Sequence, residues 1–476
     1  MLERKLLGTY LVAAFCLLGT ALASAQTDFV TFESGPVRPI ALSADGSRLF
    51  VVNTPDAHLE VFDTSGTGEP VKVASIPVGL EPVSVAVVDN DTAWVLNHLS
   101  DSVSIVSVSQ GRVVRTLLVG DQPRDIVIVD PPGPTGPRAF ITTAHRGQHR
   151  SDTSISSVSG AGDPEYTTEG VGRNDTWVFD VADPGPAYGG TPLAIVVSFS
   201  DTPRGLAVSP DGSHVYVAAF HSGNQTTTVA EGVVCDGSDA ATSCAGDGIT
   251  SPGGLSGGVL PGGVPGPSDN AAGVEAPEVG VIVKWNRATS QWEDEDGRNW
   301  SNGVRFHLPD YDVFTIDAVS LNQTAAHRHV GATLLNMVVH PDTGHLFVSN
   351  TEALNHVRFE GEGIHGGTTV QGHLAESRIT VIPAPNVSSD ASSGARHLNK
   401  HVDFSVLAHD PGFDNTAAAK SLAMPMDMAI HHDPVLGSST LYVAAFSSSK
   451  VGIFDVAELE ADTFVPSESQ HIGLSA

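Results

Sequence analysis

Six segments of the chain repeat one layout, and this repetition constrains the fold more than any other feature. Each segment has a short apolar strand, a turn rich in Gly or Asp, a second strand, a loop and a third strand. One small twisted sheet cannot bury both of its faces, so neighbouring units must stack against it. The pattern therefore predicts an all-β fold, a β-propeller of four-stranded blades. The pairs of first and second strands lie at 39–53, 83–97, 124–144, 204–220, 335–350 and 426–446.

The spacing of equivalent positions gives the size of the repeat. The first two spacings, from Val37 to Pro82 and from Pro82 to Pro123, are 45 and 41 residues, which is typical of propeller repeats. Later units are longer, so we expect loop insertions at 145–175, 221–277 and 351–376. For the fourth unit, the apolar run at 279–285 is interpreted as the third strand.

The two ends of the repeat array predict the blade count. An outer strand expected at 28–34 has no first three strands before it, and 471–476 is interpreted as the fourth strand of the sixth unit. In propellers a terminal strand often completes a blade begun at the other terminus, which avoids an open sheet edge. We therefore expect a seven-bladed type with six full repeats and an orphan N-terminal outer strand, in a natural chain that continues past Ala476. A closed six-bladed ring with a spare strand is the alternative.

The first 25 residues have the features of a secretory signal: a basic start, an apolar run over 6–18 and a small-residue cleavage site at 23–25. Residues 26–476 are then the propeller domain, in the periplasm or at the cell surface. No later apolar stretch is long enough to predict a membrane span. With 54 acidic and 24 basic residues, the net charge of −30 argues against nucleic acid as a partner.

Two cysteines, Cys235 and Cys244, follow the predicted cleavage site. In an exported chain, thiols this close in sequence are expected to form a local disulfide. The chain contains no Cys-x-x-Cys-His motif. We therefore expect no covalently bound haem within it.

Several of these segments resemble a known type of repeat. The Asp-Gly turns, the strands that read Leu-Phe-Val-Val-Asn and His-Val-Tyr-Val-Ala, and the third strands that end in Val-Phe-Asp resemble the Tyr-Val-Thr-Asn (YVTN) repeat of bacterial β-propellers. More narrowly, 278–285, 298–314, 396–401 and 441–452 resemble a group of exported propellers. Longer members of that group carry a C-terminal c-type cytochrome domain.

The resemblance implies a role in a redox system of the cell envelope. Its expected partner is a c-type cytochrome or another envelope protein. Haem c is expected only in a C-terminal continuation or in that partner, with no cofactor in this chain.

The loops between second and third strands lie on the same face of a propeller as the blade junctions, and most of the extra length falls in them. That face is the candidate functional surface. Because neutral imidazoles are common ligands of zinc and copper, a metal site is one hypothesis there, and scattered, solvated histidines are the alternative. The histidines expected on this face are His98, His145, His149, His221 and His356.

Three arginines, Arg38, Arg124 and Arg204, occupy equivalent positions at the starts of first strands, close to Asp125 and, across the predicted ring, to Asp427. Guanidiniums that converge at the channel mouth could bind a carboxylate, a phosphate or an acidic partner residue, because their planar fork suits bidentate pairing. The alternative is that each arginine pairs with an aspartate and holds blades together.

No hydrolase motif of the Gly-x-Ser-x-Gly or His-Glu-x-x-His type occurs in the sequence. We therefore expect a binding or scaffold protein rather than an enzyme. One alternative is a propeller enzyme, similar to lactonases or quinoprotein dehydrogenases, that uses the arginines and a histidine-bound metal at the channel mouth. Another is a surface adhesion module that binds its partner through the long loops.

Overall fold

The computed structural model describes residues 35–144, 152–161, 174–230, 272–274, 280–295, 297–305, 307, 310–357, 373–406, 411–466 and 471–473. Several predicted features lie outside these residues: the signal at 1–25, the orphan strand at 28–34, the cysteine pair Cys235 and Cys244, and the histidines His145 and His149.

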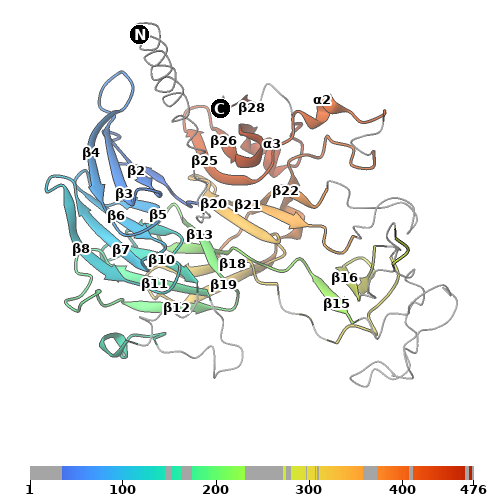
Figure 1. The fold of residues 1–476 in the computed structure, drawn as a ribbon, viewed down its shortest axis with the longest axis horizontal. Coiled ribbons are helices and arrows are strands. Elements are labelled where there is room, and N and C mark those ends of the chain that lie inside the picture. Colours follow the sequence, from blue (N-terminus) through green and yellow to red (C-terminus); the bar gives the residue numbers. More distant parts are fainter. Residues whose placement is uncertain are drawn as a thin grey trace, which may run out of the picture. The chain divides into compact units, whose positions relative to one another are not determined.

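The first three repeats form three consecutive antiparallel sheets of four strands (Figure 1). Blade 1 contains β1 (Ile40–Leu42), β2 (Arg48–Asn53), β3 (His58–Asp63) and β4 (Val71–Pro77). Blade 2 contains β5 (Pro82–Val87), β6 (Thr92–Asn97), β7 (Ser102–Ser107) and β8 (Arg112–Leu118). Blade 3 contains β9 (Ile126–Val129), β10 (Arg138–Ala144), β11 (Asn174–Asp180) and β12 (Ala194–Ser198).

The last three repeats form the other blades. Blade 4 contains β13 (Pro203–Val208), β14 (His214–Ala219), β18 (Val313–Asp317) and β19 (Gln323–Arg328), with the short β23 (Ser389–Asp390) added in parallel at its outer edge. Blade 5 contains β20 (Thr333–Val339), β21 (Leu346–Ala353), β22 (Ala375–Ile382) and β24 (Ala395–His397). Blade 6 contains β25 (Pro425–Asp433), β26 (Ser438–Ala445), β27 (Lys450–Asp455) and β28 (His471–Gly473).

Helices are few and short in the described residues. They are α2 (Asn415–Ala418) and α3 (Val456–Glu460), with the 3₁₀ turns η2 (Thr153–Ile155), η6 (Ser392–Gly394) and η7 (Phe446–Ser448). None of the helices found in the described part of the chain has the length and apolar character needed to cross a membrane.

The hydrophobic core lies between the blades, as the alternation of the strands requires. Successive side chains of a strand point to opposite faces of its sheet. In β10, for example, Ala139 and Ile141 pack in a cluster with Trp94 of blade 2, whereas Phe140 packs with Leu206 of blade 4. One such cluster joins each of the five pairs of consecutive blades, from blades 1 and 2 to blades 5 and 6. Each blade therefore depends on its neighbours for burial.

Contacts between first strands show that the blades share a common centre. The backbone of Val37 in blade 1 donates to Val83 O of blade 2 at 3.0 Å and accepts from the Asn336 amide of blade 5 at 3.1 Å. The chain is therefore a β-propeller. The described residues contain six blades, which match the six predicted repeats, whereas the strand expected for a seventh lies outside them.

One predicted strand pairing is wrong. The third strand of blade 4 is β18, which pairs with β14 from His214 to Ala218, and not the run at 279–285. That run contributes instead to β16 (Val281–Asn286), which lies between β15 (Thr226–Val229) and β17 (Gln291–Glu293) in a separate sheet, here called the inserted sheet. Both runs are short, mainly apolar and rich in β-branched residues, and such a pattern alone does not say which partner a strand takes.

The Ser-x-Asp-Gly-Ser turns of blades 1 and 4 are held by their own side chains. Asp45 Oδ1 accepts hydrogen bonds from the hydroxyls of Ser43 and Ser47, and Gly46 adopts a φ of 69°. Asp211 repeats this pattern with its two flanking serines, and these bonds lower its pKa to about 2. Such local bonds favour turns, and glycine adopts positive φ at little cost.

Candidate functional site

The centre of the propeller is built around one fully buried carboxylate, that of Asp125. Arg38 reaches it with two bonds, from Nε to Oδ1 at 3.2 Å and from Nη2 to Oδ2 at 3.1 Å, and also donates to Leu206 O at 2.8 Å. Asp125 accepts two more bonds, from the Ser84 hydroxyl at 2.8 Å and from Leu206 N at 2.9 Å. This pair ties together the first strands of blades 1 to 4.

Asp427, in the first strand of blade 6, lies near the same centre. It accepts from the Asn336 amide at 2.8 Å, and burial raises its pKa while the nearby Arg38 opposes that shift. The structure thus brings Arg38, Asp125 and Asp427 together in one polar network. Within it, Arg38 has the blade-joining role.

The other two predicted arginines are arranged differently. Arg204 is 3% exposed, and its Nε donates to Leu335 O at 3.0 Å. Its guanidinium lies 4.8 Å from the centroid of the Phe220 ring, and that of Arg124 lies 5.9 Å from the same centroid. Among the described residues, no carboxylate lies within ion-pair distance of either arginine, and Arg124 Nε is buried without a hydrogen-bond partner.

His98 lies close to both arginines, and its Nδ1 contacts Pro123 O at 3.1 Å. Burial, reinforced by the charge of Arg124, lowers the pKa of His98 to about 4. Burial and the same neighbour lower the pKa of Arg204 to about 10. At neutral pH the two arginines are therefore charged and the imidazole is neutral. We call Arg124, Arg204, Phe220 and His98 the mouth cluster.

The other two described histidines of the metal hypothesis, His221 and His356, have different surroundings. His221 is exposed, with its ring 4.4 Å from that of Phe220. Burial, followed by the charge of Lys284, lowers the pKa of His356 to about 4. Within the described ranges, His98, His221 and His356 belong to no group of three metal-ligating side chains. A metal site that includes His145 or His149 stays a prediction.

Two adjoining cavities lie between the inserted sheet and blades 4 and 5, and we call them together the insertion cleft. Their volumes are about 450 and 390 Å³. Gln225, Trp285, Arg287 and His329 line both of them. Residues of two predicted insertions, 221–277 and 351–376, thus help to form large hollows at this face.

Two buried aspartates lie beside the insertion cleft, and sequence reasoning did not single them out. Asp310 lines the cleft and accepts from Gln225 N at 2.6 Å, and burial raises its pKa. Asp312 is fully buried, accepts from Ser222 Oγ and from Val330 N, and has a pKa raised by burial to about 7. The Asp-Tyr-Asp sequence at 310–312 was the only available signal, and it matches no catalytic motif.

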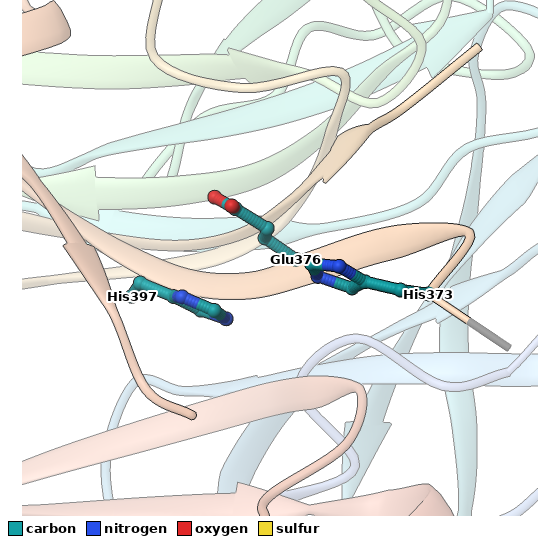
Figure 2. A group of neighbouring side chains, drawn as sticks. All are labelled: His373, Glu376 and His397. Atoms are coloured by element: carbon teal, nitrogen blue, oxygen red, sulfur yellow. The ribbon is translucent and has the colours of Figure 1, made fainter. Parts of the chain in front are cut away.

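A third group could hold a metal ion. His373, Glu376 of β22 and His397 of β24 place one potential ligand atom each within 4.8 Å of one another, and the imidazole of His397 extends toward that of His373 (Figure 2). Burial lowers the pKa of both imidazoles, and Glu376 opposes the shift. No sequence signal pointed to this group, because the strand pairing that joins its members was not specified.

No family model matches the chain, and no curated protein matches it in sequence. Among solved structures, it is similar to hydrazine synthase of Kuenenia stuttgartiensis, with 17% identity, coverage of 94% of this chain and 88% of the other, and a TM-score of 0.49. A Bacteroides uniformis protein described as a candidate 6-phosphogluconolactonase has 12% identity, coverage of 93% and 87%, and a TM-score of 0.41.

A protein of unknown function from Desulfotomaculum acetoxidans has 12% identity, coverage of 90% and 84%, and a TM-score of 0.39. At such identities and scores, these likenesses assign no activity or ligand to this chain.

Proposed function

We propose that this chain is a β-propeller binding protein and that the mouth cluster is its site for an anionic group. The observation that carries the proposal is the pair of guanidiniums on one phenylalanine ring, with no carboxylate paired to them in the described part of the chain. Glu81 attracts Arg124 and Asp125 attracts Arg204, but neither carboxylate forms an ion pair with these arginines, and burying like charges side by side is costly unless a counter-charge is paired with them. A bound anion would supply that counter-charge.

The different arrangement of Arg38 supports the proposal that the mouth cluster binds an anion. Arg38 occupies the equivalent position in blade 1 and already forms a bidentate ion pair with Asp125. Arg124 and Arg204 have the same planar fork, which forms bidentate bonds with carboxylates and phosphates. With His98 neutral, the ligand is expected to be a carboxylate or a phosphate, carried by a small molecule or by an acidic side chain.

The resemblance to exported propellers extends the proposal to a partner. An envelope protein, and in the first place a c-type cytochrome, would present the anionic group to the mouth cluster. The chain would then act as a binding scaffold in an envelope redox system. The cationic character of the mouth cluster is what makes such docking chemically reasonable.

Isothermal titration calorimetry with inorganic phosphate and with succinate, at neutral pH and low salt, tests the anion site. We expect saturable binding of at least one probe and a loss of at least tenfold in affinity in Arg124→Gln. Arg112→Gln removes an exposed arginine from β8 and should bind as the unchanged protein does. Equal affinity in all three proteins would contradict the anion site.

The partner is tested separately, by purifying the protein from its native source and recording the visible spectrum of what accompanies it. A c-type haem spectrum that Arg124→Gln loses and Arg112→Gln keeps supports the docking proposal. Absence of haem from the purified complex, with phosphate or succinate binding intact, would overturn the cytochrome partner and leave the anion site standing.

A further inference from the structure

We propose that His373, Glu376 and His397 form a binding site for a divalent transition metal, with Zn²⁺ as the ion that fits best. The three residues lie in blade 5: His373 precedes β22 by two residues, Glu376 lies in β22, and His397 ends β24. None of them belongs to the mouth cluster, so this site and the anion site stand or fall independently.

The spacing of the ligand atoms suits a single ion. One nitrogen from each imidazole and one carboxylate oxygen lie within 4.8 Å of one another. In a tetrahedral zinc site, with bonds of about 2.0–2.1 Å, ligand atoms lie roughly 3.3–3.5 Å apart. Side-chain rotations that bring these atoms closer by at most about 1.5 Å would close the site around an ion. Figure 2 shows the two imidazoles extending toward each other, with the carboxylate of Glu376 turned to one side of them.

The imidazoles carry a second, independent signal. Nε2 of His373 and Nε2 of His397 are both buried, and neither has a hydrogen-bond partner among the described residues. Buried polar atoms nearly always have partners, so two such nitrogens in one cluster need an explanation. Coordination of a metal ion would satisfy both.

The surroundings hold the imidazoles in place. Phe404 stacks on the His373 ring, with centroids 3.7 Å apart and planes 10° from parallel. The two imidazole rings are themselves nearly parallel, at 13°. A site with ligands already oriented loses little conformational entropy when the ion binds.

The ion pair that Glu376 forms within the chain is a long one. Arg378 approaches it only to 3.9 Å and lies closer to Glu352, at 3.4 Å. The carboxylate therefore remains available to a metal. Glu352, which competes for the same arginine, lines the insertion cleft and is also paired with Lys284 at 2.9 Å.

The ligand set selects the class of metal. Two imidazoles and one carboxylate suit zinc and other first-row divalent ions, and leave a fourth position for water. Calcium and magnesium prefer oxygen ligands only. We therefore expect discrimination against both of these ions.

The test is titration of Zn²⁺ into the chelator-treated, dialysed mature protein by calorimetry, with Co²⁺ as a visible reporter of imidazole coordination. The chain has 20 histidines, so the informative quantity is the site lost on substitution. We expect Glu376→Gln and His397→Ala each to weaken one zinc site at least tenfold. His431→Ala, which removes an exposed histidine of β25, should leave it unchanged.

Glu376→Gln preserves the shape of the side chain, and far-UV circular dichroism checks that each variant is folded. An unchanged number and affinity of zinc sites in folded Glu376→Gln and His397→Ala overturns the proposal. So does a Co²⁺ spectrum of the unchanged protein without bands of four- or five-coordinate cobalt, a readout that needs no variant.

Discussion

Arg38 and Asp125 form a bidentate ion pair between the first and third blades, although 87 residues separate them in the sequence. The carboxylate is fully buried, whereas the arginine side chain keeps 30% of its surface exposed. Removing one partner of a buried pair leaves an uncompensated charge, which typically costs about 3–5 kcal/mol. We expect Arg38→Met to lower the free energy of unfolding by an amount in this range, as measured by urea denaturation.

The matched control is the ion pair of Lys72 with Glu60 on the outer strands of blade 1, at 2.6 Å. Half of the lysine side chain and 12% of the glutamate side chain are exposed, so the lysine end is open to solvent, and pairs with such an end contribute about 0–1 kcal/mol. Lys72→Met should therefore have a small effect. Equal losses in the two variants would mean that Arg38 is not a link between blades.

The repeats made most of the propeller predictable, because the alternation of each strand and the turn residues between strands are local properties. They also placed Arg38, Arg124 and Arg204 at equivalent positions. Which arginine meets an acid was not predictable, since it depends on the distance across the centre from one first strand to another. Blade 1 brings Arg38 to Asp125, whereas Arg124 and Arg204 face the ring of Phe220.

The inserted sheet has a small core of its own, made by Val229, Val281, Val283, Trp292 and Trp300. Trp300 is fully buried, and its indole donates to Asp294 Oδ2 at 2.8 Å. Truncation of a buried tryptophan typically costs about 3–5 kcal/mol. We expect Trp300→Ala to remove hydrogen-exchange protection from β16 while the amides of β14 stay protected. Simultaneous loss of protection in both strands would show that the inserted sheet and blade 4 unfold as one unit.

Gly394 marks a close approach of two backbones in blade 5. A Cβ atom at this position would lie 2.1 Å from Val381 O, and a backbone carbonyl cannot move aside as a flexible side chain can. Overpacking of this kind typically costs about 1–3 kcal/mol, so Gly394→Ala should lower the midpoint of thermal unfolding. At Gly68 a Cβ atom would meet nothing within 4 Å. A Gly68→Ala variant as unstable as Gly394→Ala would contradict this explanation.

The insertion cleft and the His373, Glu376 and His397 group could not be predicted from the sequence, for a physical reason. Both depend on contacts between segments whose pairing the periodicity leaves open. The repeat pattern assigns the run at 279–285 to blade 4. A strand paired within that blade could not also form the opposite wall of a cleft beside it. Once β18 takes the place beside β14, the sheet formed by β15, β16 and β17 is free to form a cleft together with residues of blades 4 and 5.

Asp312 predicts a specific dependence of stability on pH. Burial raises its pKa to about 7 in the folded chain, whereas an unfolded aspartate has a pKa near 3.8. The stabilising contribution of this group is therefore fully present below about pH 4 and is lost as the pH rises through 7. Between pH 5 and 7 the unfolded carboxylate has already released its proton, so the loss amounts to about 1.4 kcal/mol per pH unit.

The Asp312→Asn variant isolates this effect, because an amide at this position cannot ionise. His98, whose pKa is lowered to about 4, acts in the opposite direction, because its contribution is present above pH 6.5 and is lost as the pH falls. His98 titrates in both proteins, so its contribution cancels when one free energy of unfolding is subtracted from the other. The free energy of unfolding of the unchanged protein, minus that of Asp312→Asn, should therefore fall from pH 5 to 7 and level off above pH 7. A difference that stays constant over this range would show that Asp312 is ionised in the folded protein, and that Ser222 and the Val330 amide hydrogen-bond to a carboxylate rather than to a carboxylic acid.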